Sequence, residues 1–149
     1  MTIVVISDTH GDFYELKRVA MRENGADLFL HAGDVESFGG EEIRPFAAVK
    51  GNCDYGMSKF PNEYWYMTPY GKLYMKHHPI LLKEEVERLQ EAHVKIFIHG
   101  HTHIKEARKI GDLYIFCPGS LVYPRDGGSG SYLVLEVEKN GVKATFKTL

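Results

Sequence analysis

Aspartate, asparagine and histidine recur in short polar segments, each of which follows an apolar stretch of the chain. The segments are Asp8-Thr9-His10, Gly33-Asp34, Gly51-Asn52, His77-His78 and Gly100-His101-Thr102-His103. Carboxylate, amide and imidazole groups without a thiolate are typical ligands of borderline ions such as Mn²⁺, Fe²⁺, Zn²⁺, Co²⁺ or Ni²⁺. About seven ligands are too many for one tetrahedral ion and suit two. The segments therefore predict a binuclear metal centre.

The charge of such a centre indicates which substrates it attracts. Two carboxylates, Asp8 and Asp34, oppose the charge of two dications, so the centre stays positive. A positive centre attracts phosphate, and paired dications lower the pKa of a bridging water. We therefore expect a metal-bridging hydroxide that attacks phosphorus in line.

The first half of the chain alternates strand and helix patterns, which favours a largely parallel sheet. Strands are expected over residues 3–6, 27–31 and 47–50, and helices from Phe13 to a stop at Gly25 and over 41–44. Asp12 and Glu15 fit a capping box at the start of the first helix. The polar segments follow strands, and open α/β sheets bind ligands at the carboxyl ends of their strands.

The second half has the pattern of an antiparallel sheet. Strands are expected over residues 63–67, 73–76, 95–99, 104–110, 113–117, 132–138 and 142–149, and a helix over 83–92. A parallel half followed by an antiparallel half indicates two packed sheets with helices outside. In extended backbone, residues two apart point the same way, so Asp8 with His10, and His101 with His103, are expected to converge.

Four ordered motifs resemble a known enzyme family. Asp8-Thr9-His10, Gly33-Asp34, Gly51-Asn52-Cys53-Asp54 and Gly100-His101-Thr102-His103 are similar to the signature of calcineurin-like metallophosphoesterases. The chain resembles their small bacterial and archaeal phosphodiesterase branch, to which the retromer small subunit is also similar. The resemblance runs through Pro118-Gly119-Ser120 and implies an α/β fold, a β-sandwich of two mixed sheets with helices on both outer faces.

The resemblance also implies a role for each candidate residue. Asp8, His10 and His103 would bind one metal, and Asn52, His101 and a histidine of the central motif the other. Asp34 would bridge the two ions. The implied cofactors are two divalent ions, with Mn²⁺ first and Ni²⁺, Fe²⁺, Zn²⁺ or Co²⁺ as alternatives. Asp34, Asn52, His77 and His78 are the candidate catalytic residues.

Two departures from the family pattern affect this interpretation. Larger phosphatases carry a histidine after the ligand asparagine, whereas Cys53 stands here and is a poor proton donor. The central motif of the branch usually reads Thr-His-Gly-His, but this chain has Lys76-His77-His78. An ungapped match puts Lys76 at the ligand position, and a one-residue deletion puts His77 there. We favour His77, because a dication repels a charged lysine; His78 stays open as a ligand, a substrate contact or a loop residue.

Length, composition and charge argue against several other classes of protein. A chain of 149 residues with a formal net charge of −2 predicts one domain, residues 1–149, that does not require nucleic acid. No apolar run is long enough for a membrane, and the N-terminus lacks the basic start of a signal peptide. Cys53 and Cys117 form no disulfide framework or zinc pattern. The expectation is a soluble, cytoplasmic protein, and the strand at residues 64–66 offers an aromatic patch for a homodimer.

Three functions follow as hypotheses. The first is a metal-dependent phosphodiesterase that acts on a small phosphodiester. The second is a catalytically weak or inactive metal-binding scaffold for protein assembly, which the altered Lys76-His77-His78 motif favours. The third is a phosphomonoesterase, which Cys53 disfavours because monoester alkoxides leave poorly without a proton. The sequence does not distinguish cyclic nucleotides, dinucleotides, nucleic-acid ends and lipid-derived diesters as substrates.

Overall fold

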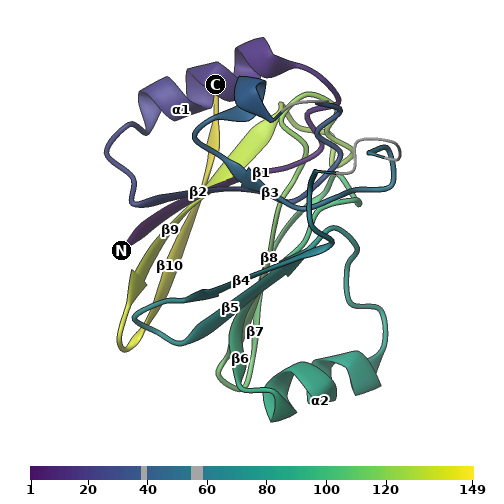
Figure 1. The fold of residues 1–149 in the computed structure, drawn as a ribbon. Coiled ribbons are helices and arrows are strands. Elements are labelled where there is room, and N and C mark those ends of the chain that lie inside the picture. Colours follow the sequence, from purple (N-terminus) through teal and green to yellow (C-terminus); the bar gives the residue numbers. More distant parts are fainter. Residues whose placement is uncertain (38–39, 55–58) are drawn as a thin grey trace.

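The computed structural model describes residues 1–37, 40–54 and 59–149. They form two five-stranded sheets that pack face to face, with a helix on the outer face of each (Figure 1). The first sheet has the order β10-β9-β1-β2-β3 and the second β4-β5-β6-β8-β7. The expected α/β sandwich of two mixed sheets is confirmed.

The first sheet joins the two ends of the chain. Its strands are β1 (Thr2–Ile6), β2 (Leu28–His31), β3 (Ala47–Ala48), β9 (Ser131–Glu138) and β10 (Gly141–Thr148). The strands β1, β2 and β3 are parallel, and β9 runs antiparallel to β1 and to β10. The C-terminal hairpin therefore extends the sheet that the N-terminal strand began.

The second sheet is not antiparallel throughout, so the expected contrast between the two halves was wrong. Its strands are β4 (Glu63–Met67), β5 (Lys72–Lys76), β6 (Val94–Ile98), β7 (Lys105–Ile110) and β8 (Leu113–Pro118). The central β5, β6 and β8 are parallel, and only the edge strands β4 and β7 are antiparallel. Helix α2 (Lys83–Glu91) links β5 to β6, and such a crossover returns the chain in the same direction.

Alternate side chains of the central strands build three apolar layers. Ile3 and Val5 of β1 face the core between the sheets, whereas Val4 and Ile6 face α1 (Phe13–Arg22). A third layer lies between the second sheet and α2. Because β1 is buried on both faces, its sequence is a continuous apolar run and does not alternate between apolar and polar residues.

Local signals set the bounds of the helices. The Asp12 carboxylate accepts a hydrogen bond from the N–H of Glu15 at 3.1 Å, so the expected N-cap forms. Helix α1 ends at Arg22 with Glu23 as its C-cap, three residues before Gly25 would have stopped it. The short helix η1 (Glu41–Ile43) is a 3₁₀ turn. No helix in the described part of the chain is long and apolar enough to cross a membrane.

The aromatic edge strand β4 has one face toward the core. Tyr64 packs against the layer between the sheets, and the Trp65 ring stacks on Tyr74 of β5 with centroids 4.2 Å apart. Trp65 and Tyr66 remain partly exposed. This exposed edge leaves a dimer contact as a prediction.

Candidate metal centre

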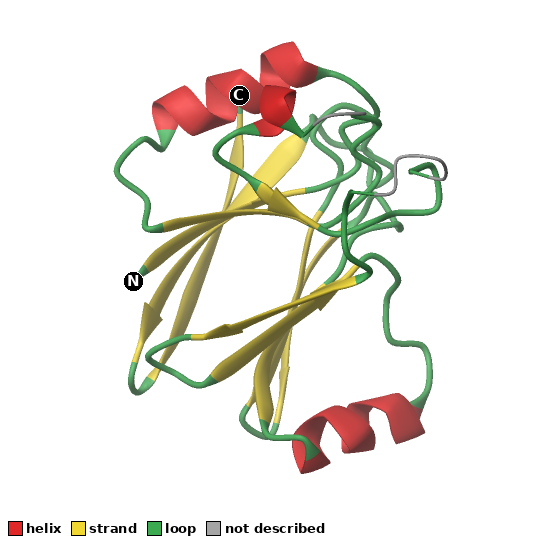
Figure 2. Cartoon of the chain, in the orientation of Figure 1, coloured by secondary structure: helices red, strands yellow, loops and turns green. Residues whose placement is uncertain are grey.

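The loops that carry the polar motifs gather at one end of the molecule, beyond the carboxyl ends of the parallel strands (Figure 2). Backbone hydrogen bonds tie the loop after β1 to the loop after β2. Asp8 donates to the Gly33 carbonyl and His10 to the Asp34 carbonyl, each at 3.0 Å. These bonds bring Asp8 and Asp34 side by side, although 26 positions separate them in the sequence.

Many candidate ligands have a left-handed backbone. The residues and their φ angles are Asp8 (53°), His10 (46°), Asp34 (58°), His101 (71°) and His103 (60°). This conformation is uncommon outside glycine and costs on the order of 1–3 kcal/mol per residue, so it persists only where other contacts enforce it. The expectation of extended backbone in these loops was therefore wrong.

A first cluster consists of Asp8, His10 and His103, whose candidate ligand atoms all lie within 4.8 Å of one another. The His103 Nε2 lies 3.3 Å from Asp8 Oδ1. The His103 Nδ1 lies 2.6 Å from the Tyr123 carbonyl oxygen, an acceptor that fixes the ring proton on Nδ1. The Nε2 lone pair of His103 is thereby directed at the cluster, as it is in metal-binding histidines.

A second cluster consists of Asn52, His77 and His101. The Asn52 Oδ1 lies 2.9 Å from His77 Nε2 and 3.1 Å from His101 Nδ1. The Ala32 carbonyl lies 2.7 Å from His77 Nδ1 and holds the proton there, which again turns Nε2 toward the cluster. A side chain at Gly33 would collide with the His77 ring, so this approach requires glycine.

Asp34 lies between the two clusters. Its Oδ2 is 3.8 Å from His10 Nε2 and 3.4 Å from His77 Nε2. Its Oδ1 accepts a hydrogen bond from the N–H of Cys53 at 2.8 Å. Burial alone would raise the pKa of Asp34, but the contacts with His77 and the Cys53 N–H hold this pKa well below its usual range.

Asp8 carries the one buried side-chain oxygen in the described residues that lacks a hydrogen-bond partner. That atom is Oδ1, the oxygen that faces His103 and His77. The other oxygen, Oδ2, accepts hydrogen bonds from the Ser7 hydroxyl at 2.6 Å and the His101 N–H at 3.1 Å. Burial raises the pKa of Asp8 because the charged carboxylate is poorly solvated. A buried, unpaired carboxylate oxygen among imidazole nitrogens fits a cation.

The structure brings the seven candidate ligands together in the two groups that the resemblance implied, but only one of the two convergences expected from residue spacing occurs. Asp8 and His10 converge, as expected. His101 and His103 diverge, because His101 contacts Asn52 whereas His103 contacts Asp8. A turn at Gly100-His101-Thr102, closed by a 2.9 Å bond from the Thr102 N–H to the Gly100 carbonyl, separates their directions.

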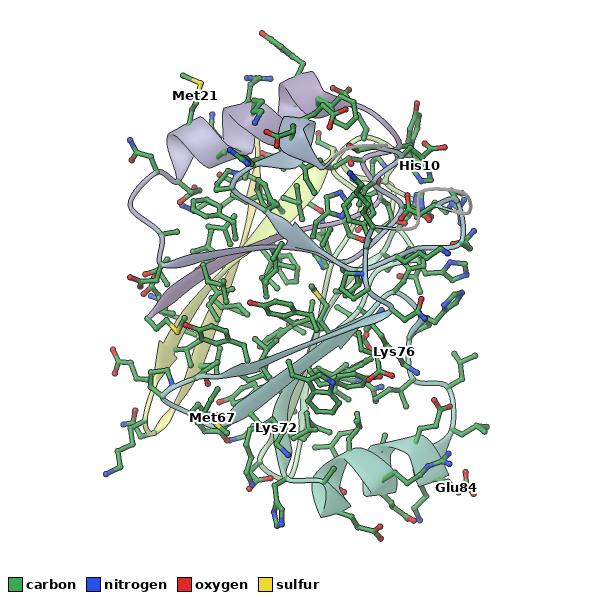
Figure 3. The ribbon with its side chains drawn as sticks, viewed as in Figure 1. His10, Met21, Met67, Lys72, Lys76 and Glu84 are labelled. Carbon is green, nitrogen blue, oxygen red and sulfur yellow. The ribbon has the colours of Figure 1, made fainter. Side chains whose placement is uncertain are left out.

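The motif after β5 presents its side chains on alternate sides. His77 is buried within the second cluster, whereas Lys76 Nζ lies 3.9 Å from a Glu85 carboxylate oxygen of α2. Figure 3 shows Lys76 on the second sheet, apart from His10 of the first cluster. His78 is exposed, and its ring centroid is 4.6 Å from that of His101. Lys76 therefore lies outside both clusters, and His78 lies at the rim of the second.

Several supporting residues have roles that their side-chain types did not reveal. Asp54 accepts hydrogen bonds from the backbone N–H groups of Asp34, Val35, Glu36 and Gly51, so it holds the Asp34 loop and orients no histidine.

The buried His31 joins the loops after β1 and β2 through Thr9 and the Gly33 N–H. The carbonyls of Ala32 and Tyr123 are invisible to motif reading, because any residue carries one. Glu36, 3.4 Å from His10 Nδ1, was also missed.

Cys53 lies beside the clusters but does not have the character of a reactive thiolate. Its sulfur belongs to a group with His10 and Asp34 in which the ligand atoms lie within 4.8 Å of one another. Burial and the nearby Asp34 charge raise the pKa of the Cys53 thiol. The thiol therefore stays protonated at neutral pH and is a weak acid.

Comparisons with known proteins identify the family of the chain. The family model for the calcineurin-like phosphoesterase superfamily domain matches residues 1–140. The chain is 31% identical over 153 residues to the probable metallophosphoesterase YsnB of Bacillus subtilis, covering 98% of this chain and 90% of that protein. It is 25% identical over 163 residues to the phosphodiesterase YfcE of Escherichia coli, covering 91% and 88%.

Solved structures share the fold. A predicted phosphoesterase from Streptococcus pneumoniae superposes with a TM-score of 0.88 at 28% identity, over 99% of this chain and 88% of that one. The Zn²⁺ complex of Vps29 from Entamoeba histolytica superposes with a TM-score of 0.74 at 20% identity, over 99% and 98%. The family is metal-dependent, and the chain belongs to the calcineurin-like phosphoesterase superfamily.

Proposed function

We propose that this protein is a metal-dependent phosphodiesterase with a binuclear centre. The observation that carries the proposal is the unpaired, buried Asp8 Oδ1, together with an Asp34 carboxylate that lies between the two clusters. A buried carboxylate without a partner is costly unless a cation neutralises it. The relatives from Bacillus subtilis and Escherichia coli support phosphoester hydrolysis as the reaction class.

Each cluster would hold one divalent ion, and Asp34 would contact both. The first ion would take Asp8, His10 and His103, and the second Asn52, His77 and His101. When bound, two dications supply a hydroxide nucleophile at neutral pH and neutralise charge on the phosphoryl oxygens. Mn²⁺ is our first choice, and Ni²⁺, Fe²⁺, Zn²⁺ or Co²⁺ suit the same oxygen and nitrogen donors.

The chain itself orients the ligands and contacts the substrate. The carbonyls of Ala32 and Tyr123 hold the proton of His77 and His103 on Nδ1, so neither ring needs to change its tautomer on binding. The exposed His78 lines a cavity of about 500 Å³ on the second-cluster side, where it would contact one ester group of the substrate.

Cys53 favours diesters with good leaving groups. Larger family members have a proton-donating histidine here, whereas the raised pKa of Cys53 makes it a poor acid. An alkoxide that must leave without a proton leaves slowly. We therefore expect diesters with activated leaving groups to react faster than diesters that must expel an alkoxide.

Metal removal and a single substitution test the proposal. After EDTA treatment, we expect no hydrolysis of bis(p-nitrophenyl) phosphate. Mn²⁺ should restore this activity, and the restored protein should hydrolyse the diester faster than the monoester p-nitrophenyl phosphate. Asp34→Asn should lower kcat/KM by more than about 100-fold, since even groups that only support metal ligands contribute 10–100-fold. Asp112→Asn, at an exposed hairpin turn away from the clusters, is the matched control. Full activity of Asp34→Asn protein would overturn the proposal.

A scaffold is the second candidate function, and an apolar surface beside the site favours it. Leu81 is 82% exposed, and Leu81 and Ile104 line a cavity of about 360 Å³ between the loop after β5 and the loop after β6. A partner protein could cover such a patch. Two bound ions with no turnover of any phosphodiester would favour this function over the enzyme.

A further inference from the structure

Two cavities lie beside the candidate metal centre, one next to each cluster. One of about 500 Å³ adjoins the second cluster through Asn52, His77 and His78. The other, of about 640 Å³, adjoins the first cluster and is lined by His10, Glu36, His103, Tyr123, Pro124 and Arg125. A phosphodiester has two ester substituents, whereas a monoester has one. Two cavities beside one centre therefore suit a substrate with an arm on each side of phosphorus.

The loop that lines the larger cavity is anchored to the first cluster by its backbone. The Ser120 hydroxyl donates to the Asp8 carbonyl at 2.9 Å and accepts from the Tyr123 N–H at 2.8 Å. The Tyr123 carbonyl accepts from His103, and the Arg125 N–H donates to the His103 carbonyl at 2.9 Å. The backbone contacts leave the side chains of Tyr123 and Arg125 available at the cavity.

Tyr123 offers an exposed aromatic face. It is 58% exposed, and its ring forms a T-shaped contact with the His10 ring, with centroids 5.6 Å apart. An aromatic ring that is more than half exposed is available for stacking. Base–aromatic stacking is worth about 1–3 kcal/mol and needs no particular base.

Arg125 is an exposed cation without a carboxylate partner among the described residues. The nearest acidic neighbour in sequence, Asp126, instead accepts a hydrogen bond from the Lys105 N–H at 3.2 Å and lies 3.7 Å from the Lys105 ammonium. Glu36, the acidic residue of the cavity, faces His10 Nδ1 at 3.4 Å. A guanidinium in this position suits a phosphate, which it can bind through two parallel hydrogen bonds.

We propose that Tyr123 and Arg125 form a recognition surface for one arm of the substrate, a nucleotide unit that carries a further phosphate. The base would stack on Tyr123, and the further phosphate would bind Arg125. The inference rests on the proposed function and names its substrate class: short linear oligonucleotides with a terminal phosphate. A cavity of about 640 Å³ is within the usual range for a ligand of this size.

The reaction on such a substrate is a balanced hydrolysis. Water oxygen forms a new bond to the bridging phosphorus, and the P–O bond to one nucleoside breaks. One proton of water ends on the released hydroxyl, and the other stays on the new phosphate monoester or passes to solvent. The products are a nucleotide and a nucleoside or second nucleotide. No oxidant or co-reactant besides water is required.

Three diesters with the same centre test the assignment. The Mn²⁺-loaded protein is assayed on thymidylyl-thymidine with a 5′-phosphate, on the same dinucleotide without it, and on bis(p-nitrophenyl) phosphate. We expect kcat/KM to be about tenfold higher with the 5′-phosphate, because a hydrogen bond to a charged group contributes 1.5–3 kcal/mol. Arg125→Gln should abolish that preference, Arg125→Lys should restore part of it, and turnover of bis(p-nitrophenyl) phosphate should not change.

Two further variants separate recognition from structure. Tyr123→Leu keeps the backbone carbonyl that His103 needs, and it should lower kcat/KM about tenfold on both dinucleotides. Arg18→Gln on the outer face of α1 removes an exposed arginine elsewhere and should match wild type. Equal losses for Arg125→Gln on all three substrates would overturn the assignment, because Arg125 would then act on the scissile phosphate or on the loop.

A binding measurement keeps this proposal separate from the proposed function. Calorimetry should detect thymidine 3′,5′-bisphosphate binding to wild-type protein, with and without Mn²⁺, and at least fivefold weaker binding to Arg125→Gln. No turnover of any diester would overturn the proposed function, while weakened bisphosphate binding by this variant would still uphold the recognition surface. Equal bisphosphate binding by both proteins would overturn the surface itself.

Discussion

The two clusters differ in the charge of the oxygen ligand that belongs to each alone. In the first cluster, this oxygen is Asp8 Oδ1 of a carboxylate, which is buried and has no hydrogen-bond partner. In the second, it is Oδ1 of the neutral Asn52 amide, 2.9 Å from His77 Nε2 and 3.1 Å from His101 Nδ1. A cation in the first cluster thus neutralises a buried charge, whereas the amide of the second cluster has no charge to neutralise.

This difference indicates an order of metal affinity. An ion in the first cluster relieves a buried, unpaired carboxylate and breaks no hydrogen bond of that atom. An ion in the second cluster gains less, because Asn52 is a neutral ligand and only the shared Asp34 carries charge there. We therefore expect the first ion to bind more tightly.

The largest effect is expected from Asp8→Asn, which removes the carboxylate that distinguishes the first cluster. The first ion should be lost, and diester turnover should fall by more than about 100-fold. Because the amide carries no charge to bury, the free energy of unfolding of metal-free Asp8→Asn protein should equal or exceed that of wild type. The metal content of the purified protein measures the loss of the ion, and urea unfolding in the presence of EDTA measures the free energy of unfolding.

His101→Gln is the matched variant in the second cluster. It should lower turnover but leave one tightly bound ion per chain, and it should not stabilise the metal-free protein. Loss of the tighter ion from His101→Gln protein instead would reverse the proposed order.

His77 and Lys76 provide the next test, because they are neighbours with different surroundings. His77→Gln should remove the weaker ion and lower kcat by about 100-fold, since His77 contacts Asn52 and Asp34. Lys76→Gln removes only a 3.9 Å pairing with Glu85 and should leave metal content unchanged. Metal titration of both variants distinguishes the two residues, and a larger loss for Lys76→Gln would restore the ungapped reading of the motif.

The sequence predicted which residues meet but not how their backbones turn. Apolar runs predicted the strands and helices, and motif order predicted that the candidate ligands lie together, because strand ends bring those residues to one edge. The left-handed φ angles of Asp8 and His101 escaped prediction, because non-glycine residues adopt them only under tertiary constraints. The two-residue spacing of His101 and His103 did not separate them, whereas the resemblance assigned them to different clusters.

Long-range pairing was the other feature that local patterns did not reveal. The strand β9 pairs with β1 across the whole chain, with Val4 opposite Val134. The alternation of β9 indicates a strand, but nothing in that pattern specifies its neighbour. The direction of β5 and β6 depends on α2 as a crossover, which periodicity alone did not separate from a hairpin arrangement.

A smaller effect is expected from His31, which supports the first cluster without contacting a candidate ion. Its ring is buried between Thr9 and the Gly33 N–H, and burial lowers its pKa to about 3, so it stays neutral. His31→Gln should weaken the tighter ion by 10–100-fold, as loss of an orienting group typically does, and affect the second ion less. Competition with a metal chelator measures the dissociation constants of the two ions. An equal loss of affinity for both ions would contradict the proposed role of His31 in the first cluster.

Loss of the His99–Glu106 pair should have the smallest effect on activity but a distinct effect on stability. The pair lies at the base of the loop that carries His101 and His103. The Nε2 of His99 lies 2.6 Å from Glu106 Oε1. Burial alone would lower the pKa of His99, but contacts with Cys117 and Glu106 raise it to about 9. Because the folded pKa exceeds the usual value of 6.5, this pair stabilises the fold fully below about pH 6.5 and loses that contribution as pH rises toward 9.

Glu106→Gln should flatten this pH dependence without changing the order of metal affinity. The shift corresponds to on the order of 3 kcal/mol between pH 6.5 and 9, and the variant should lose part of it, because Cys117 also raises the pKa of His99. Urea unfolding of EDTA-treated protein at pH 6, 7.5 and 9 measures the slope. If Glu106→Gln changed the relative affinity of the two ions instead, the loop from His99 to Glu106 would help to set the difference between the clusters, and the unpaired Asp8 oxygen would no longer account for it alone.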